Sequence, residues 1–561
     1  MASKTQRGEN QVSGTLRGID VLNSPVLNKG TAFKEQEREE LGLVGLLPPS
    51  IEIIDRQVER VLGHLEQKSS DLERYIYLIG LEDRNETLFF KVVMSDPERF
   101  LPIVYDPTVG EACLKFGHIY RRSRGMYVSL REKGRVAEVL RNSPIKDACF
   151  ICVSTGGRIL GLGDIGANGM GIPIGKLQLY TACAGVPPDG LLPILLDIGT
   201  TNEKLLADPL YLGLRQHPPS LEELDEFVDE FVEAVQEVFP NCCIPFEDWN
   251  GVQAVRYLAR YRNKVLCYND DIQGTAGVTL TGLINALKIT GGQLKEQRIL
   301  FAGAGSAAVG LANLIVSALR QQGVAPEVAR RQIRLFDTHG LVVAGRSGLA
   351  AHKAPFAYNG SPSKPFNHLD LASECPQLVA AIDDFKPTIL IGVSTVGKLF
   401  SREVVEAMSH HNSRPIIFAL SNPVEKHECL PKDAYAWSEG KAIYAGGVQF
   451  PPVHIGGQTL LPSQANNLYI FPAVSLAIYL TRPKRATDEM FIEAAQAVAD
   501  QVSPEQLKLG MLFPPQSDIV KVEVEAGARV AGFMFHNGLA TVERPADIRT
   551  WVEAQLYYPN Y

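Results

Sequence analysis

Residues 298–337 constrain the fold most strongly, because they contain every part of one β-α-β unit. The segment RILFAGAGSAAVG predicts a buried strand, a glycine turn of the form G-x-G-x-x-A and a helix that runs to about Gln322. A second apolar run, Gln332–Phe336, ends at Asp337. Such turns let the backbone approach a pyrophosphate, and an acid at the end of the second strand receives ribose hydroxyls. The unit predicts a Rossmann-type dinucleotide-binding domain, with turn residues Gly303, Gly305, Ser306, Ala307 and Ala308.

The stretch Tyr268–Gly277, YNDDIQGTAG, places two acids where a strand meets a helix. An apolar run ends at Tyr268, and Val278–Ile289 has the apolar spacing of a helix. Open α/β sheets bind ligands at such junctions. Because neighbouring residues on an extended backbone point to opposite sides, we expect Asp270 and Asp271 to divide their roles between a neighbouring cation and a metal. The alternative is helix capping within a surface turn.

A second pair of acids follows another apolar run. The segment IPFEDW places Glu247 and Asp248 at a strand end about 25 residues before the first pair. Four carboxylates that converge without basic partners would repel one another strongly. A divalent cation removes that repulsion, and Mg²⁺ or Mn²⁺ prefers such oxygen ligands. The two strand ends therefore predict a metal site.

Lys176 and Tyr105 are candidates for proton transfer. Lys176 ends a glycine-rich segment that begins at Gly161, and it follows Pro173 at a predicted helix start. The positive end of a helix dipole would lower the pKa of its ammonium, as a general base requires. Tyr105 lies in LPIVYDPTVG, at the end of a segment expected to be extended. The alternatives are a solvated lysine and an amphipathic core tyrosine.

Asparagines follow two later apolar segments. Asn422 ends the predicted strand PIIFALSNP, and Asn466 and Asn467 precede the apolar run that begins at Leu468. Such residues are usually turn residues, although two sites in one sheet can hold a carboxylate or a nicotinamide amide. The segment GVSTVGKL resembles a phosphate-binding loop, but Leu399 replaces the required hydroxyl, so we reject that interpretation.

The composition excludes several classes of protein. At 561 residues the chain is too long for one typical domain, and 45% hydrophobic residues is ordinary for a globular protein. A net charge of −8 without a basic stripe argues against nucleic-acid binding, and no apolar run is long enough to span a membrane. Nine scattered cysteines favour a reducing compartment over a zinc or disulfide framework. The first 24 residues lack a signal-peptide core, which leaves a short transit peptide open.

These patterns predict an α/β protein with a helical N-terminal domain, a central α/β substrate and metal domain, a Rossmann-type domain and a short C-terminal segment. Residues 35–145 look mostly helical, and α/β texture begins near Cys149. The C-terminal residues give no clear signal. The expected domains are residues 1–123, residues 124–269 with 467–530, residues 270–466 and residues 531–561.

Seven segments taken together resemble malic enzymes: LPIVYDPTVG, RILGLGDIGANGMGIPIGKLQLYTAC, IPFEDW, YRNKVLCYNDDIQGTAG, LFAGAGSAAVG, FALSNP and ANNLYIFP. They occur in the family's order from about Leu27 to about Ala531. The resemblance implies oxidation of L-malate by NAD or NADP, followed by decarboxylation to pyruvate and carbon dioxide with Mg²⁺ or Mn²⁺. It also implies a homotetramer, a dimer of dimers, or a homodimer. A cytoplasmic location is expected, with the mitochondrial matrix as the alternative.

The resemblance also implies residue roles. Tyr105 matches the general acid, Lys176 the general base and Asp270 the acid that hydrogen-bonds the lysine. The expected metal ligands are Glu247, Asp248 and Asp271. The expected substrate-binding residues are Arg158, Asn422, Asn466 and Asn467, and Asn422 is also expected at the cofactor. Two loops, 446–450 and 463–467, depart from the family's usual sequence.

The choice between NADP and NAD depends on the residues after Asp337. An acid at this position repels a 2′-phosphate unless cations offset it, and the segment DTHGLVVAGRSGLAAHK supplies His339, Arg346 and Lys353. Lys353 lies seven residues after the Gly345-Arg346 pair, as in family members that use NADP. We therefore expect NADP as the cofactor, with NAD as the alternative.

Two rival functions are weaker. A hydroxyacid dehydrogenase without decarboxylation has no need of four carboxylates and a metal. A nucleotide-sensing module or phosphotransferase is supported only by GVSTVGKL, and a bare dinucleotide-binding regulator has no need of Lys176 and Tyr105.

Overall fold

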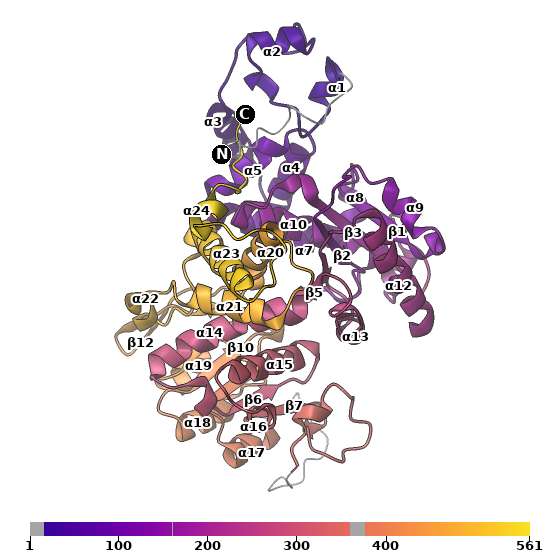
Figure 1. The fold of residues 1–561 in the computed structure, drawn as a ribbon. Coiled ribbons are helices and arrows are strands. Elements are labelled where there is room, and N and C mark those ends of the chain that lie inside the picture. The colour runs from indigo at the N-terminus through magenta and orange to yellow at the C-terminus, as the bar shows by residue number, and fades with distance from the viewer. Residues whose placement is uncertain (1–15, 160, 360–375) are drawn as a thin grey trace.

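The computed structural model describes residues 16–159, 161–359 and 376–561. Figure 1 shows a helical region at one end, an α/β unit beside it and a second α/β unit at the other end. From residue 16 to residue 119 the chain forms eight α-helices, several of which begin at capping side chains such as Ser70, Asn85 and Asp96. Their bounds are α1 Ile19–Leu22, α2 Glu35–Glu40, α3 Ile54–Glu66, α4 Asp71–Glu82, α5 Glu86–Ser95, α6 Pro97–Val104, α7 Thr108–Leu114 and α8 Phe116–Ile119.

The first sheet has five parallel strands in the order β1-β3-β2-β4-β5. Their bounds are β1 Met126–Ser129, β2 Phe150–Ser154, β3 Leu191–Asp197, β4 Ile244–Glu247 and β5 Cys267–Asn269. Strands β2 to β5 are buried along their whole length, which explains their nearly continuous apolar sequence. Strand β1 corrects the sequence prediction, which gave mostly helix for residues 35–145. It is an edge strand whose side chains are largely half-buried, so its apolar pattern is weak.

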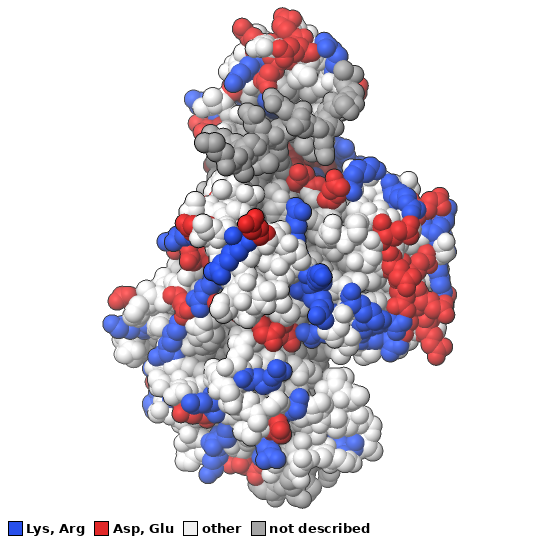
Figure 2. All heavy atoms as spheres, in the orientation of Figure 1, with Lys and Arg blue, Asp and Glu red and all other residues white. Residues whose placement is uncertain are grey.

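The helices of this unit include α9 Val136–Arg141, α10 Gly171–Ala184, α11 Glu203–Ala207, α12 Leu221–Val238 and α13 Gly251–Tyr261. Helix α10 is buried along its whole length, and it ends at Gly185 in the left-handed conformation (φ 69°). Helix α12 packs one apolar face on the sheet and leaves its acidic face in solvent. Figure 2 shows acidic side chains gathered over this edge of the molecule.

The second sheet has seven strands in the order β14-β11-β10-β9-β6-β7-β8, and only β8 is antiparallel to its neighbour. Their bounds are β6 Ile299–Ala302, β7 Ile333–Asp337, β8 Gly340–Leu341, β9 Ile389–Gly392, β10 Ile416–Ala419, β11 Ile443–Gly446 and β14 Ser463–Gln464. The chain goes from β6 to β7 on one side and later returns to β9 on the other. The strand order therefore switches at β6, which is where such sheets bind dinucleotides.

The remaining helices follow the first sheet in the chain. They are α14 Thr275–Thr290, α15 Ser306–Gln321, α16 Pro326–Arg331, α17 Pro376–Phe385, α18 Arg402–His411, α19 Pro431–Trp437, α20 Phe471–Thr481, α21 Asp488–Ala499, α22 Pro504–Lys508, α23 Ile519–His536 and α24 Ile548–Glu553. A separate hairpin pairs β12 Val453–Ile455 with β13 Gln458–Leu460. Helix α23, which the sequence did not predict, packs against α20 and α21 in the core between the two sheets.

Two further findings concern membrane-spanning helices and disulfide bonds, which the composition had already addressed. No helix within residues 16–159, 161–359 and 376–561 is long and apolar enough to cross a membrane. The eight cysteines that lie in these ranges are free thiols.

Candidate active site

Lys176 lies between two acids at the centre of the molecule. Its Nζ donates to Asp270 Oδ2 at 2.7 Å and contacts Glu247 Oε1 at 2.8 Å. Only 1% of the Lys176 side chain is exposed. Asn467 Nδ2 also donates to Asp270 Oδ2, at 2.5 Å. Helix α10, strand β4, the turn before α14 and the segment before α20 therefore meet at one buried ion cluster. The solvated-lysine alternative is wrong.

The pKa of Lys176 differs from the sequence prediction. Burial alone would lower the pKa of this ammonium, but the charges of Asp270 and Glu247 outweigh burial and raise it well above its usual range. Lys176 also lies in the second turn of α10 rather than at its start. The helix dipole therefore has less influence on it than the two carboxylates at hydrogen-bond distance.

Tyr105 lies beside this lysine. Its ring centroid is 5.3 Å from Lys176 Nζ, and that of Phe471 is 4.1 Å away on another side. Gly175 makes room for the tyrosine, because a Cβ there would lie 2.8 Å from Tyr105 Cδ2. Burial raises the pKa of Tyr105 well above its usual range, so its hydroxyl keeps its proton. The expectation of an extended segment is wrong. Asp96 caps a helix that Pro97 begins, and Tyr105 follows its last residue.

Asp271 faces away from its neighbour Asp270. Its Oδ2 accepts a hydrogen bond from the backbone nitrogen of Asp248 at 2.8 Å. The two acids therefore have different partners, as predicted, but the reason differs. The strand ends at Asn269, and residues Asp270–Gly274 form one π-helical turn. Burial raises the pKa of Asp271 to about 6, with a further contribution from Asp270.

The acids at the two strand ends offer the carboxylate oxygens that a hard divalent cation prefers. Burial and mutual repulsion raise the pKa values of Glu247 and Asp248, and Glu247 Oε2 has no hydrogen-bond partner. A cation would relieve both conditions. Across the described residues, however, no three histidine, cysteine or acidic side chains converge as a formed metal site. Lys176 contacts only Oε1 of Glu247, so Oε2 is the oxygen that a metal would meet without displacing the lysine.

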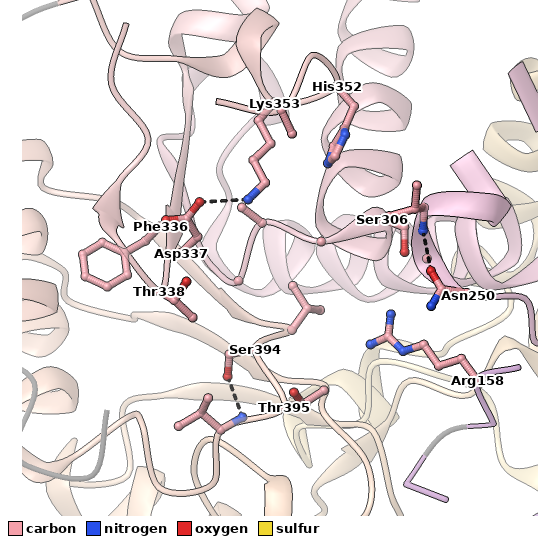
Figure 3. Close-up of a pocket in the computed structure, with 18 of the residues that line it drawn as sticks. Arg158, Asn250, Ser306, Phe336, Asp337, Thr338, His352, Lys353, Ser394 and Thr395 are labelled. Atoms are coloured by element: carbon pink, nitrogen blue, oxygen red, sulfur yellow. Dashed lines mark hydrogen bonds and ion pairs between the residues drawn. The ribbon is translucent and has the colours of Figure 1, made fainter. Parts of the chain in front are cut away.

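A cavity of about 600 Å³ lies along the carboxyl ends of β6, β7 and β9. Figure 3 shows Lys353 and Asp337 on one side, Ser394 and Thr395 across from them, and Arg158 at the end. Its polar and charged lining residues are Arg158, Asn250, Ser306, Asp337, Thr338, His352, Lys353, Ser394 and Thr395. Arg158 connects this cavity to the acids, because its backbone nitrogen donates to the carbonyl of Asp248 at 3.3 Å.

The glycine turn forms one wall of this cavity. Gly303 has φ 114°, and a Cβ there would meet the carbonyl oxygen of Val393 at 2.5 Å. Gly305 precedes the first residue of α15, whose N-terminus faces the cavity with free backbone N–H groups. Ala308 is fully buried against the sheet. These are the features that a pyrophosphate requires.

Asp337 closes the far end of the cavity and is held by two cations. Arg346 donates to both of its carboxylate oxygens, at 2.9 and 2.5 Å, and Lys353 Nζ donates to Oδ2 at 2.8 Å. These bonds outweigh burial and lower the pKa of Asp337 to about 2. The backbone nitrogen of His339 also donates to Asp337 Oδ1, at 2.9 Å. The cations expected near Asp337 therefore lie beside it.

The remaining predicted residues lie at the edges of the site. Asn466 caps the turn that holds Asn467, since its Oδ1 accepts from Leu468 N at 3.0 Å. Asn422 follows β10, and its amide nitrogen, when turned to donate, lies 3.2 Å from the carbonyl oxygens of Ser421 and Gly447. Among the residues predicted to bind substrate or cofactor, those that do not line the cavity are Ala307, Ala308, Arg346, Asn422, Asn466 and Asn467.

Several cavity residues were not predicted as functional. Ser394 and Thr395 belong to GVSTVGKL, which follows β9 and reaches no helix before Arg402, so this segment is not a phosphate-binding loop. The sequence could have placed Ser394 and Thr395 at the cavity, because they follow β9, the next parallel strand after the first β-α-β unit. Asn250 and His352 gave no such signal, since the first follows an acid pair and the second lies in an irregular segment.

Together these features define an α/β protein with a Rossmann-type dinucleotide cavity and a buried lysine–carboxylate centre, which the Arg158–Asp248 contact connects. A family model described as "Malic enzyme, NAD binding domain" matches residues 272–534, and one described as "Malic enzyme, N-terminal domain" matches residues 82–262. The chain therefore belongs to the malic enzyme family, as the sequence motifs indicated.

Individual relatives agree with this assignment. The chain is 45% identical to the NADP-dependent malic enzyme of Anas platyrhynchos, over 97% of this chain and 96% of that protein. It is 44% identical to the NADP-dependent malic enzyme of Homo sapiens, over 97% and 94% of the two chains. The crystal structure of Entamoeba histolytica malic enzyme has the same fold at 23% identity, with a TM-score of 0.55 over 92% of each chain.

Proposed function

We propose that this protein catalyses the oxidative decarboxylation of L-malate to pyruvate and carbon dioxide, with NADP as the oxidant and Mg²⁺ or Mn²⁺ as the metal. The observation that supports this most directly is the position of Lys176, buried between Asp270 and Glu247. Asp248, the neighbour of Glu247, contacts Arg158 in the lining of the dinucleotide cavity. The names of the relatives, which are NADP-dependent malic enzymes, support the same reaction. When bound, the metal polarises the oxygens of malate and the dinucleotide accepts a hydride.

Lys176 is the proposed general base for the 2-hydroxyl of malate. It must be neutral to accept this proton, whereas the two carboxylates beside it favour the charged form. A divalent cation held by Glu247, Asp248 and Asp271 would offset much of this negative charge. The pKa of the lysine would then fall, because its burial already disfavours the ammonium. Binding of the metal and activation of the base are therefore coupled.

Tyr105 is the proposed general acid. Its hydroxyl stays protonated because burial disfavours the phenolate. The ring lies next to Lys176, so a substrate carbon held at this lysine is within reach of both groups. Tyr105 would donate its proton to carbon 3 after carbon dioxide has left. Arg158, at the end of the cavity beside Asp248, is the proposed partner of a malate carboxylate.

The rival of a dehydrogenase without decarboxylation differs in its products and in its metal requirement. It would release a keto acid of four carbons and would not depend on Glu247, Asp248 and Asp271. The buried acids with raised pKa values favour the metal-dependent reaction.

The preference for NADP is proposed to depend on Lys353. Its ammonium lies in the cavity beside Asp337, where the ribose of the adenosine half is expected. A charge-assisted contact to a 2′-phosphate is worth on the order of 1.5–3 kcal/mol, which is about tenfold or more in affinity. Lys353→Gln should therefore raise the KM for NADP about tenfold and leave that for NAD nearly unchanged. Equal effects on both cofactors, or a wild type that prefers NAD, would contradict this assignment.

A homotetramer or homodimer is proposed to form through the N-terminal region. Large apolar side chains are exposed there, namely Leu16, Ile19, Val26, Val44, Leu46, Ile51 and Ile53. Figure 1 shows that α1 and α2 project from the body of the molecule. Such a concentration is typical of an interface between subunits. Light scattering should give a mass above that of one chain. A cytoplasmic location stays a prediction.

A further inference from the structure

Glu428 is a buried carboxylate behind the dinucleotide cavity. It lies in the segment between β10 and α19, and none of its surface is exposed. It belongs neither to the acid cluster around Lys176 nor to the lining of the cavity. Burial raises the pKa of Glu428, and hydrogen bonds from Ser421 and Ser394 oppose this rise. Burying a carboxylate costs free energy unless hydrogen bonds satisfy it. The donors that surround Glu428 therefore show which parts of the chain it holds together.

Both carboxylate oxygens of Glu428 accept hydrogen bonds. Oε1 accepts from the backbone nitrogen of Ser394 at 2.8 Å, from Ser394 Oγ at 2.7 Å and from Ser421 Oγ at 2.5 Å. Oε2 accepts from the backbone nitrogen of Ser421 at 3.3 Å. Ser421 Oγ in turn accepts from the backbone nitrogen of Thr395 at 2.8 Å. One side chain therefore joins the loop after β9 to the loop after β10.

The carboxylate lies directly against the end of β9. A Cβ on Gly392, the last residue of that strand, would lie 2.6 Å from the carboxyl carbon of Glu428. Any larger residue at position 392 would displace the glutamate. The close fit of Gly392 and Glu428 leaves the two loops little freedom to separate.

These two loops serve the half of the cavity opposite Asp337. Ser394 and Thr395 line the cavity, and Figure 3 shows them across from Lys353. Asn422 directly follows Ser421. In a sheet of this topology, β6 and β7 receive the adenosine half of a dinucleotide, and the strands on the other side of the switch point receive the nicotinamide half. Strands β9 and β10 are those strands.

We propose that Glu428 is a positioning residue for the nicotinamide half of the cofactor. It acts through Ser394, Thr395 and Ser421, whose backbone it fixes at the carboxyl ends of β9 and β10. The inference rests on the dinucleotide binding proposed above, but not on the choice of substrate. It predicts that loss of Glu428 weakens binding of the nicotinamide half and spares the adenosine half, which faces Asp337 and Lys353 at the other end of the cavity.

The test compares two probes on the full-length Glu428→Gln variant. NADP occupies both halves of the cavity, whereas adenosine 2′,5′-bisphosphate occupies only the adenosine half. Glutamine keeps the shape of the side chain but cannot accept all the donors that face it. The Kd of NADP should therefore rise about tenfold or more, while that of the bisphosphate should change less than about twofold. Should the wild type prefer NAD, then NAD and ADP replace these probes.

Two further variants and a stability measurement complete the design. Glu425→Gln removes an exposed carboxylate three residues earlier, and both Kd values should stay at the wild-type level. Ser421→Ala removes one donor to Glu428 and should reproduce the selective loss of NADP binding at a smaller size, even if the glutamine variant is poorly folded. Thermal unfolding of each variant measures the structural contribution separately.

Equal weakening of both probes would show that Glu428 only supports the fold and would overturn the proposal. Unchanged NADP binding in both Glu428→Gln and Ser421→Ala would also overturn it. A wild type that binds NADP tightly but does not oxidise malate would instead overturn the proposed reaction and leave the role of Glu428 open to the same comparison. A wild type that binds no dinucleotide would overturn both.

Discussion

Tyr105 and Lys176 share one pocket but are assigned opposite proton transfers. Tyr105→Phe keeps the ring beside Lys176 and removes only the proton. It should lower kcat for pyruvate formation by about 100-fold or more, because general acid catalysis typically contributes that much.

Lys176→Ala should lose the oxidation step and recover part of it with added small amines. Steady-state kinetics with a series of amines measures both effects, and a lysine variant that keeps wild-type activity would disprove its role as the base.

The residues of this centre were predictable to different degrees. Asp270, Asp271, Glu247 and Asp248 follow apolar strands, so their convergence follows from the parallel sheet. The pairing of Lys176 with Asp270 and Glu247 did not follow from local sequence. It reversed the expected direction of the lysine pKa, because charges from two other elements outweigh the local helix dipole.

At the scale of single elements, the π-helical turn Asp270–Gly274 sets the position of Asp270. A Cβ on Gly274 would lie 2.0 Å from Asp270 Oδ1, so Gly274→Ala must displace this carboxylate. We expect kcat to fall at least about tenfold, since misplacing a catalytic group by 1 Å can cost about 100-fold. Gly63→Ala in α3 is the matched control, because a Cβ there meets nothing within 4 Å. Equal activity of the two variants would refute the role of this turn.

Glu82 links the N-terminal helices to α10. It accepts a hydrogen bond from Gln178 and pairs with Arg124, and burial raises its pKa from 4.5 to about 7. Because the folded pKa exceeds the unfolded one, the folded state binds more protons between about pH 4.5 and 7. Stability from this group is therefore complete at low pH and falls as the pH rises through that window.

Glu82→Gln should remove this pH-dependent loss. Arg124 keeps Asp83 as a partner at 2.7 Å, so the variant leaves no unpaired guanidinium. We expect the gain in Tm over the wild type to be larger at about pH 8 than at about pH 5. It should amount to on the order of 2–3 kcal/mol in unfolding free energy at the higher pH. Thermal unfolding at both values measures it, and a gain independent of pH would contradict the raised pKa.

The sequence predicted the helices and strands that have a clear apolar pattern, and it missed or misassigned those that lack one. Strands β2 to β5 and the β6–α15–β7 unit lie close to their expected positions, because continuous apolar runs and glycine turns specify them. The segment before Tyr105 was misassigned, because its apolar run is too short to distinguish a strand from a helix end. Helix α23 was missed, since it is buried on several sides and lacks a clear amphipathic stripe.

At the scale of the whole molecule, the acids of the first sheet and the cavity of the second are brought together by elements distant in sequence. Helix α20 carries Phe471 to Lys176, and the segment before it carries Asn467 to Asp270. The C-terminus returns to the N-terminal helices, where Tyr561 donates to Gln57 and accepts from Asn85. No domain therefore holds the proposed site alone, and the boundaries predicted from the sequence stay a prediction.

The proposed reaction is tested most directly by the stoichiometry of its products. The purified protein is incubated with L-malate, NADP and Mn²⁺, and NADPH, pyruvate and oxaloacetate are measured over time. We predict one pyruvate for each NADPH, no accumulation of oxaloacetate, and loss of both products when a chelator removes the metal. Formation of NADPH with oxaloacetate as the final product, or full activity in excess chelator, would contradict the assignment of a metal-dependent oxidative decarboxylase.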